Sequence, residues 1–110
     1  MKNTSAEKTT QKNNIKNNIV TQEKLQKYFE ITGAALELCK KNLDTQRLKD
    51  AKDFLDMASR YYSDAKYFED KNDYVLAFAA LNYAHGWLDA GARIRLFKVN
   101  DSKLFTVDDV

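Results

Sequence analysis

Hydrophobic and polar positions along this chain follow the spacing of α-helices. Large apolar residues recur three and four positions apart through residues 21–42, 45–70 and 73–97, which is the periodicity of one helix face. Thr21 and Asp44 stand where the first two stretches begin, and both residue types are favourable N-caps. Proline is absent and glycine occurs only three times, so few residues interrupt the pattern. The sequence therefore predicts three helices with these boundaries.

The second and third expected helices each carry a seam in which small residues alternate with large ones. The seam of residues 45–70 comprises Leu48, Ala51, Leu55, Ala58, Tyr62, Ala65 and Glu69. The seam of residues 73–97 comprises Tyr74, Ala77, Leu81, Ala84, Leu88, Gly91 and Arg95. Heptad spacing of this kind packs neighbouring helices at a shallow angle. The prediction is an all-α fold, an antiparallel three-helix bundle that is left-handed and spectrin-like.

The segments on either side of the bundle lack this periodicity. Residues 1–19 are polar and poor in aromatic residues, a composition typical of disorder, so we expect a disordered leader before a bundle that spans residues 20–97. Residues 98–110 are expected to form an extended C-terminal tail. Leu104 and Phe105 could pin this tail to the bundle, and a flexible end is the alternative.

Charge and hydropathy narrow the functional classes. Net charge is +2, and the first 20 residues hold four lysines and one glutamate, which leaves −1 for residues 21–110. Nucleic acid is not expected as a partner, because such a surface needs clustered positive charge. No stretch approaches the roughly 18 consecutive apolar residues of a membrane span, and the amino terminus has no apolar signal core. We expect a cytoplasmic protein that does not associate with membranes.

The expected third helix is unusual, because apolar or small residues occupy nearly its whole circumference. A surface helix normally has a polar back. Trp87 and Tyr83 share a second face of this helix with Leu76, Ala80 and Ile94. In a three-helix bundle the first helix would cover that face, which makes it core. Incomplete cover would leave Tyr83 and Trp87 lining a groove or an oligomer interface.

His85 and Asp89 lie one turn apart on the same helix. An imidazole and a carboxylate at this spacing serve as metal ligands or as an acid–base pair in some sites, but no third donor follows at a recognisable spacing. The favoured interpretation is a packed histidine that hydrogen-bonds to Asp89 or to a tyrosine hydroxyl. Cys39, the only cysteine, is expected to be an inert residue of an apolar face. No catalytic residue, metal or cofactor is predicted.

The run AKDFLDMASRYYSDAKYFEDKNDYVLAFAALNYAHGWLDAGARIRLF, residues 51–97, resembles an archaeal family known as domain of unknown function 357. Its recognisable segments are YYSDAKYF, DYVLAFAALNYAHGWLDAG and RLF. The resemblance implies a compact antiparallel three-helix bundle in an archaeal cytoplasm. It implies no activity, so no functional residue is carried over from the family.

Together these features favour a non-enzymatic interaction or adaptor module. It would use the last helix to meet an unknown protein partner or a second copy of itself, with Tyr83, His85, Trp87 and Asp89 as the candidate residues. The alternative is a small-ligand, metal or nucleotide-associated helical domain, in which His85 and Asp89 lie in a pocket between helices.

Overall fold

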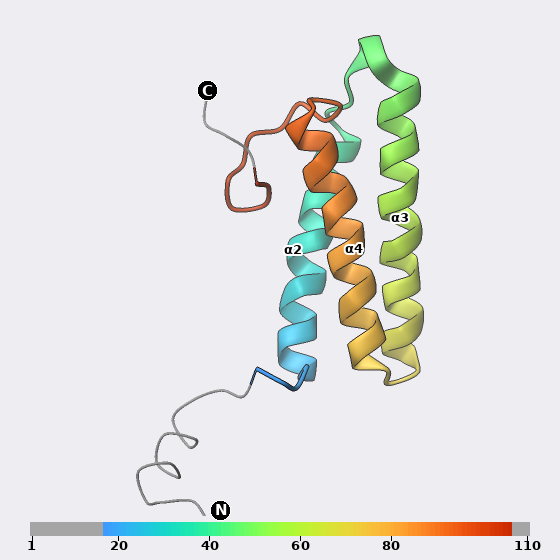
Figure 1. Ribbon diagram of the computed structural model, residues 1–110, viewed down its shortest axis with the longest axis vertical. Helices are drawn as coiled ribbons and strands as arrows, with labels where there is room; N and C mark the ends of the chain where they lie inside the picture. Colours follow the sequence, from blue (N-terminus) through green and yellow to red (C-terminus); the bar gives the residue numbers. More distant parts are fainter. Residues whose placement is uncertain (1–16, 107–110) are drawn as a thin grey trace, which may run out of the picture.

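The structure, a computed structural model, describes residues 17–106. Helix α2 spans Gln22–Lys40, the 3-10 helix η1 spans Thr45–Arg47, α3 spans Leu48–Asp70 and α4 spans Tyr74–Arg93. The chain runs up α2, down α3 and up α4, and α4 lies between the other two helices in the view of Figure 1. The described residues contain one isolated antiparallel bridge and no longer strand. The predicted all-α three-helix bundle is confirmed.

The first helix begins where the sequence predicted, whereas the second, predicted from residue 45, begins as the 3-10 helix η1 and becomes the α-helix α3 only at Leu48. The Thr21 hydroxyl accepts a hydrogen bond from the Lys24 N–H at 3.1 Å, and Asp44 accepts one from the Gln46 N–H at 3.0 Å. Both contacts are those of an N-cap: the predicted cap at Thr21 is confirmed, and Asp44 caps η1, while α3 itself starts after Arg47 without a side-chain cap. The leader predicted for residues 1–19 lies, up to residue 16, outside the described residues.

Small residues on the two seams bring α3 and α4 together. The fully buried seam residues are Ala51, Ala58 and Ala65 of α3 and Ala77, Leu81, Ala84 and Leu88 of α4. Alanine projects little from a helix, so ridges and grooves of the two helices can interlock at short range. The seams are confirmed over their central positions, while Leu48 at one end and Arg95 at the other are exposed.

A residue in the left-handed conformation closes the turn between α3 and α4. Asn72 has a φ of 60°, which asparagine tolerates better than most residues with a Cβ. The Asn72 N–H donates to the Glu69 carbonyl at 2.9 Å, and the Asp73 N–H donates to the Phe68 carbonyl at 2.9 Å. This pair of bonds is a Schellman motif. Asp73 then caps α4 by accepting from the Leu76 N–H.

Helix α4 ends at Arg93, whereas periodicity predicted a helix up to residue 97. A second Schellman motif ends it: Arg95 has a φ of 65°, and the Leu96 N–H donates to the Gly91 carbonyl at 2.8 Å. Phe97 folds back, and its ring covers Gly91 where a Cβ would otherwise stand. The chain reverses here because glycine leaves room for that ring, and helical periodicity does not report such a tertiary contact.

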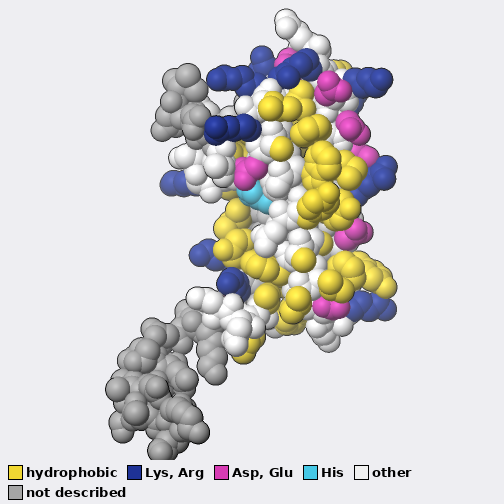
Figure 2. Space-filling view, in the orientation of Figure 1, with side chains coloured by type: hydrophobic (Ala, Val, Ile, Leu, Met, Phe, Trp, Pro, Cys, Tyr) yellow, Lys and Arg dark blue, Asp and Glu magenta, His cyan; other side chains and the backbone are white. Residues whose placement is uncertain are grey.

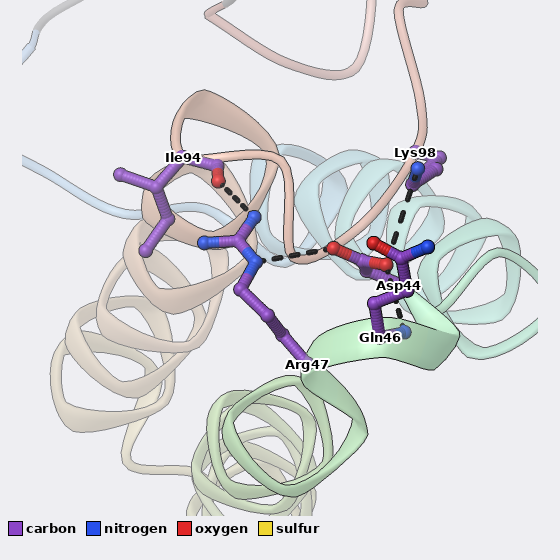
Figure 3. Close-up of polar contacts among 5 residues, drawn as sticks. All are labelled: Asp44, Gln46, Arg47, Ile94 and Lys98. Carbon is purple, nitrogen blue, oxygen red and sulfur yellow. Dashed lines mark hydrogen bonds and ion pairs between the residues drawn. The ribbon is translucent and has the colours of Figure 1, made fainter.

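A polar network joins the start of α3 to the segment after α4 (Figure 3). The Asp44 carboxylate accepts from Arg47 Nε at 3.1 Å, and the Arg47 guanidinium also donates to the Ile94 carbonyl. The Lys98 ammonium lies 3.9 Å from the same carboxylate. In addition, the Asp44 N–H donates to the Leu96 carbonyl at 2.8 Å. Side-chain and backbone contacts therefore join the connection before α3, which contains Asp44, to the segment that follows α4.

The C-terminal segment, residues 98–106, returns to the bundle. Phe105 is 3% exposed and belongs to the same hydrophobic cluster as Leu88 and Cys39, and Leu104 is half-buried against that cluster. Of the two arrangements considered for the tail, the structure has the one in which Leu104 and Phe105 pin it. Residues 107–110 lie outside the described part.

Candidate functional site

The four candidate residues of α4 form two pairs on different sides of the helix. Tyr83 and Trp87 are one turn apart and contact aromatic residues of α3. His85 and Asp89 are also one turn apart, and they contact α2 and the C-terminal segment. The helical repeat separates the pairs by roughly 200° around the axis. The structure therefore places the candidates in two sites.

Both ring nitrogens of His85 are engaged. Nε2 lies 2.6 Å from the Leu104 carbonyl oxygen, and Nδ1 lies 3.1 Å from Thr32 Oγ1. A carbonyl can only accept, so Nε2 carries the proton and donates; in the neutral ring Nδ1 then accepts from the Thr32 hydroxyl. The histidine is packed and hydrogen-bonded as expected, but its partners are a buried threonine and a backbone carbonyl in place of Asp89 or a tyrosine.

Asp89 binds the same C-terminal segment one turn further along α4. Its carboxylate accepts from the Thr106 N–H at 2.8 Å and from the Thr106 hydroxyl at 3.3 Å.

Burial, and secondarily the charge of Asp89, raises the pKa of the Cys39 thiol to about 12. The thiol is therefore protonated at neutral pH, and Cys39 lacks the thiolate that nucleophilic chemistry needs.

The surroundings of His85 do not have the form of a metal site. A ligating histidine directs a nitrogen lone pair at the metal, and neutral His85 directs its lone pair at Thr32. No group of three or more His, Cys, Asp or Glu side chains in residues 17–106 is placed to hold a metal ion. Phe105 stacks beside the imidazole with ring centroids 6.3 Å apart. A segment of the chain thus occupies the position that the alternative interpretation gave to an interhelical pocket.

Thr32 completes this site and was not among the residues predicted from the sequence. It lies on the apolar face of α2 and is 2% exposed, and a buried hydroxyl requires a hydrogen-bond partner. A threonine between Phe29 and Ala35 on a buried face was the one available signal. Its partner, His85, is 53 residues away in the chain, so no sequence spacing could indicate the pair.

Trp87 and Tyr83 pack against the edge of α3. The Trp87 and Phe54 rings meet edge to face with centroids 5.0 Å apart, and the Tyr83 and Tyr61 rings do so at 4.4 Å. The first helix was predicted to cover this face, whereas the ring neighbours of Trp87 lie on α3 and on α4 itself. Trp87 Nε1 is buried without a hydrogen-bond partner in the described part, and Tyr83 is 51% exposed.

The solvent side of α4 is almost uncharged. Its exposed positions are Val75, Leu76, Ala79, Asn82, Tyr83, Gly86, Ala90 and Arg93, and the exposed Ile94 follows the helix. Arg93 is the one charged residue in this set. We call the apolar members, Val75, Leu76, Ala79, Tyr83, Gly86, Ala90 and Ile94, the α4 face. Figure 2 shows hydrophobic side chains gathered over α3 and α4.

None of the helices in residues 17–106 is both long and apolar enough to cross a bilayer.

These features define a small all-α domain whose last helix is covered on one side by the C-terminal segment and is apolar at most of its exposed positions. The chain belongs to the DUF357 family, described as proteins of unknown function, whose model matches residues 27–97, more than half of the chain. The match covers most of α2, all of α3 and α4, and the chain reversal at Phe97. No curated protein and no solved structure matches the chain.

Proposed function

We propose that this protein is a non-enzymatic interaction module whose α4 face binds an amphipathic helix of a protein partner. The observation that carries the proposal is the near absence of charge on the solvent side of α4, where one of the eight exposed helix positions is charged. Surface helices normally turn charged residues toward water. Contiguous exposed apolar residues mark interaction sites.

The shape of the α4 face suits a helix as the partner. Small residues, Ala79, Gly86 and Ala90, follow its centre line, and Leu76 and Ile94 lie toward its two ends. A Cβ added to Gly86 would meet no heavy atom within 4 Å. A second helix can therefore approach closely along the centre, with its apolar side chains against the larger residues at the ends.

The margin of this face on α3 is acidic, which favours a basic margin on the partner. Asp50 lies one turn before Phe54, and Asp64 lies three residues after Tyr61, so both carboxylates neighbour the aromatic contacts of Trp87 and Tyr83 on the surface of α3. Both are exposed. Complementary charge across an interface sets the orientation of the partner and speeds association.

The buried reactive groups support a non-enzymatic role. The Cys39 thiol stays protonated at neutral pH because its pKa is raised to about 12, and both nitrogens of His85 are used in structural hydrogen bonds. A general base needs a lone pair that is free to accept a substrate proton.

The cytoplasmic location expected from the sequence is part of this proposal.

Titration with designed helices tests the proposed function. The probes are two amphipathic peptides of about 20 residues, long enough to form helix, one built from Leu and Lys and the other from Leu and Glu. Calorimetry with the full-length protein is expected to show binding of the Leu–Lys helix only. The variant Ala79→Lys/Ala90→Lys is expected to weaken this binding at least tenfold, roughly 1.4 kcal/mol, because its ammonium groups would be desolvated in the interface.

The matched control is Ala34→Lys/Ser63→Lys, which adds the same charge at exposed positions of α2 and α3 and is expected to bind like the wild type. Equal weakening in both double variants, or no binding to the wild type, overturns the proposal. Light scattering on the same samples distinguishes a second copy as partner. In that case the wild type and control are dimers and the α4-face variant is a monomer.

A further inference from the structure

The C-terminal segment is held by contacts to its backbone. His85 Nε2–H donates to the Leu104 carbonyl at 2.6 Å, and Asp89 accepts from the Thr106 N–H at 2.8 Å. Phe105, between these two residues, is 3% exposed. A donor for one carbonyl and an acceptor for the amide two residues later are what a groove offers to a bound peptide strand.

Side-chain contacts add selectivity to this backbone binding. The Phe105 ring lies against the imidazole, with centroids 6.3 Å apart and planes inclined by 30°. The Thr106 hydroxyl donates a second hydrogen bond to Asp89 at 3.3 Å. Thr32, 2% exposed, holds His85 Nδ1 at 3.1 Å and so directs Nε2 toward the segment. These contacts thus suit a buried phenylalanine followed by a hydroxyl residue.

The connection to the triplet of residues 104–106 is exposed over residues 100–103. Val99 packs against the core and the Lys98 N–H donates to the Asn42 carbonyl at 2.7 Å, but residues 100–103 are exposed, and the Leu104 and Phe105 N–H groups donate to the nearby Asp101 carbonyl, within the segment itself. Segments with few buried contacts open at a lower free energy than the core. Opening at residues 100–103 would release the triplet without breaking a contact between the three helices.

We propose that Thr32, His85 and Asp89 form a peptide-binding clamp for an apolar–Phe–Thr sequence, occupied here by the chain's own residues 104–106. The clamp does not use the α4 face, so it stands independently of the proposed function. A short tether gives the bound triplet an effective concentration on the order of mM. A free peptide of the same sequence then binds well only when the tethered triplet is weakened.

A fluorescein-labelled peptide of residues 98–110, measured by fluorescence anisotropy against full-length variants, tests the clamp. Phe105→Ala weakens the tethered triplet, and this variant is expected to bind the peptide at least about tenfold more tightly than the wild type. Thr106→Pro removes the amide donor at an exposed position and leaves the buried ring unchanged, so it provides the same test if Phe105→Ala fails to fold. A peptide carrying Phe105→Ala is expected not to bind.

The decisive comparison is made in the Thr106→Pro background. Adding Asp89→Ala is expected to abolish peptide binding, because it removes the acceptor for the peptide amide. Adding Glu30→Ala, which removes an exposed carboxylate of α2, is expected to leave binding unchanged. The proposal is overturned if the Thr106→Pro chain keeps the circular dichroism of the wild type and does not bind the peptide, or if Asp89→Ala leaves binding intact.

Discussion

At the residue scale, Asp44 joins two connections of the fold through a single carboxylate. It accepts hydrogen bonds from the Gln46 N–H and from Arg47 Nε, and Lys98 lies nearby. The Gln46 N–H, followed by the Arg47 side chain, lowers the pKa of the Asp44 carboxyl below its ordinary value. The folded protein therefore favours the charged form of this residue.

Asp44→Asn is expected to lower stability at neutral pH and to have a smaller effect in acid. Asparagine keeps a side-chain oxygen for the Gln46 N–H, so the loss reports the negative charge beside Arg47. Because folding lowers this pKa, the charge stabilises the protein above the ordinary Asp pKa, about 4, and the contribution is lost as pH falls through the folded value. Urea unfolding at neutral pH and at about pH 2 measures both differences, and an equal loss at both contradicts the assignment.

At the scale of secondary-structure elements, α3 and α4 both end in Schellman motifs without glycine. The left-handed positions are held by Asn72 and Arg95, with φ values of 60° and 65°. This conformation brings the Cβ of an L-residue close to the following carbonyl oxygen, at a cost of roughly 1–2 kcal/mol, and asparagine is among the residues that adopt it routinely. The left-handed conformation therefore costs more free energy at Arg95, after α4, than at Asn72, after α3.

Arg95→Gly is expected to raise the free energy of unfolding by about 1 kcal/mol, because glycine adopts this conformation without a clash. Thermal unfolding followed by circular dichroism measures the gain, which corresponds to roughly 4–8 °C in a domain of this size. Asn72→Gly is the control and should gain less. A lower melting temperature for Arg95→Gly would show that the arginine side chain contributes more than its backbone costs.

At the scale of the whole molecule, the segment after α4 closes the bundle. Phe97 pairs with Leu43 through an antiparallel bridge and places its ring over Gly91. The chain then continues to Phe105, which joins the cluster that contains Leu88. The segment after α4 therefore holds the connection between α2 and α3 against the end of α4 (Figures 1 and 3).

Two glycines of α4 provide a matched pair for testing this closure. Gly86→Ala is expected to stabilise the protein by about 1 kcal/mol, because alanine is the better helix former and no atom lies within 4 Å of the new Cβ. Gly91→Ala puts its Cβ into the Phe97 ring, and overpacking of this kind costs about 1–3 kcal/mol. Guanidinium unfolding of both variants measures the difference, and stabilisation by Gly91→Ala would contradict the observed packing.

Some features of this protein could be predicted from local sequence patterns, whereas others depend on contacts between residues far apart in the chain. The caps at Thr21 and Asp44 and the buried seams of α3 and α4 were predictable, because capping and helical periodicity act over three or four residues. The end of α4 was not, because it depends on a ring six residues after Gly91. For the candidate site, His85 and Asp89 were selected, and Leu104 and Phe105 were named as residues that could pin the tail, but Thr32 and the contact between these two groups were not predicted.

The sequence by itself determined three helices, the family and an unusually apolar last helix. Tertiary structure alone decided how the sides of that helix are used: His85 and Asp89 hold the C-terminal segment, while Tyr83 stays exposed beside α3. The physical reason is the range of the interactions. Helix formation depends on residues that are close together in the sequence. The partners of His85 lie 53 residues before it and 19 residues after it in the chain, and they meet it only once the helices have packed.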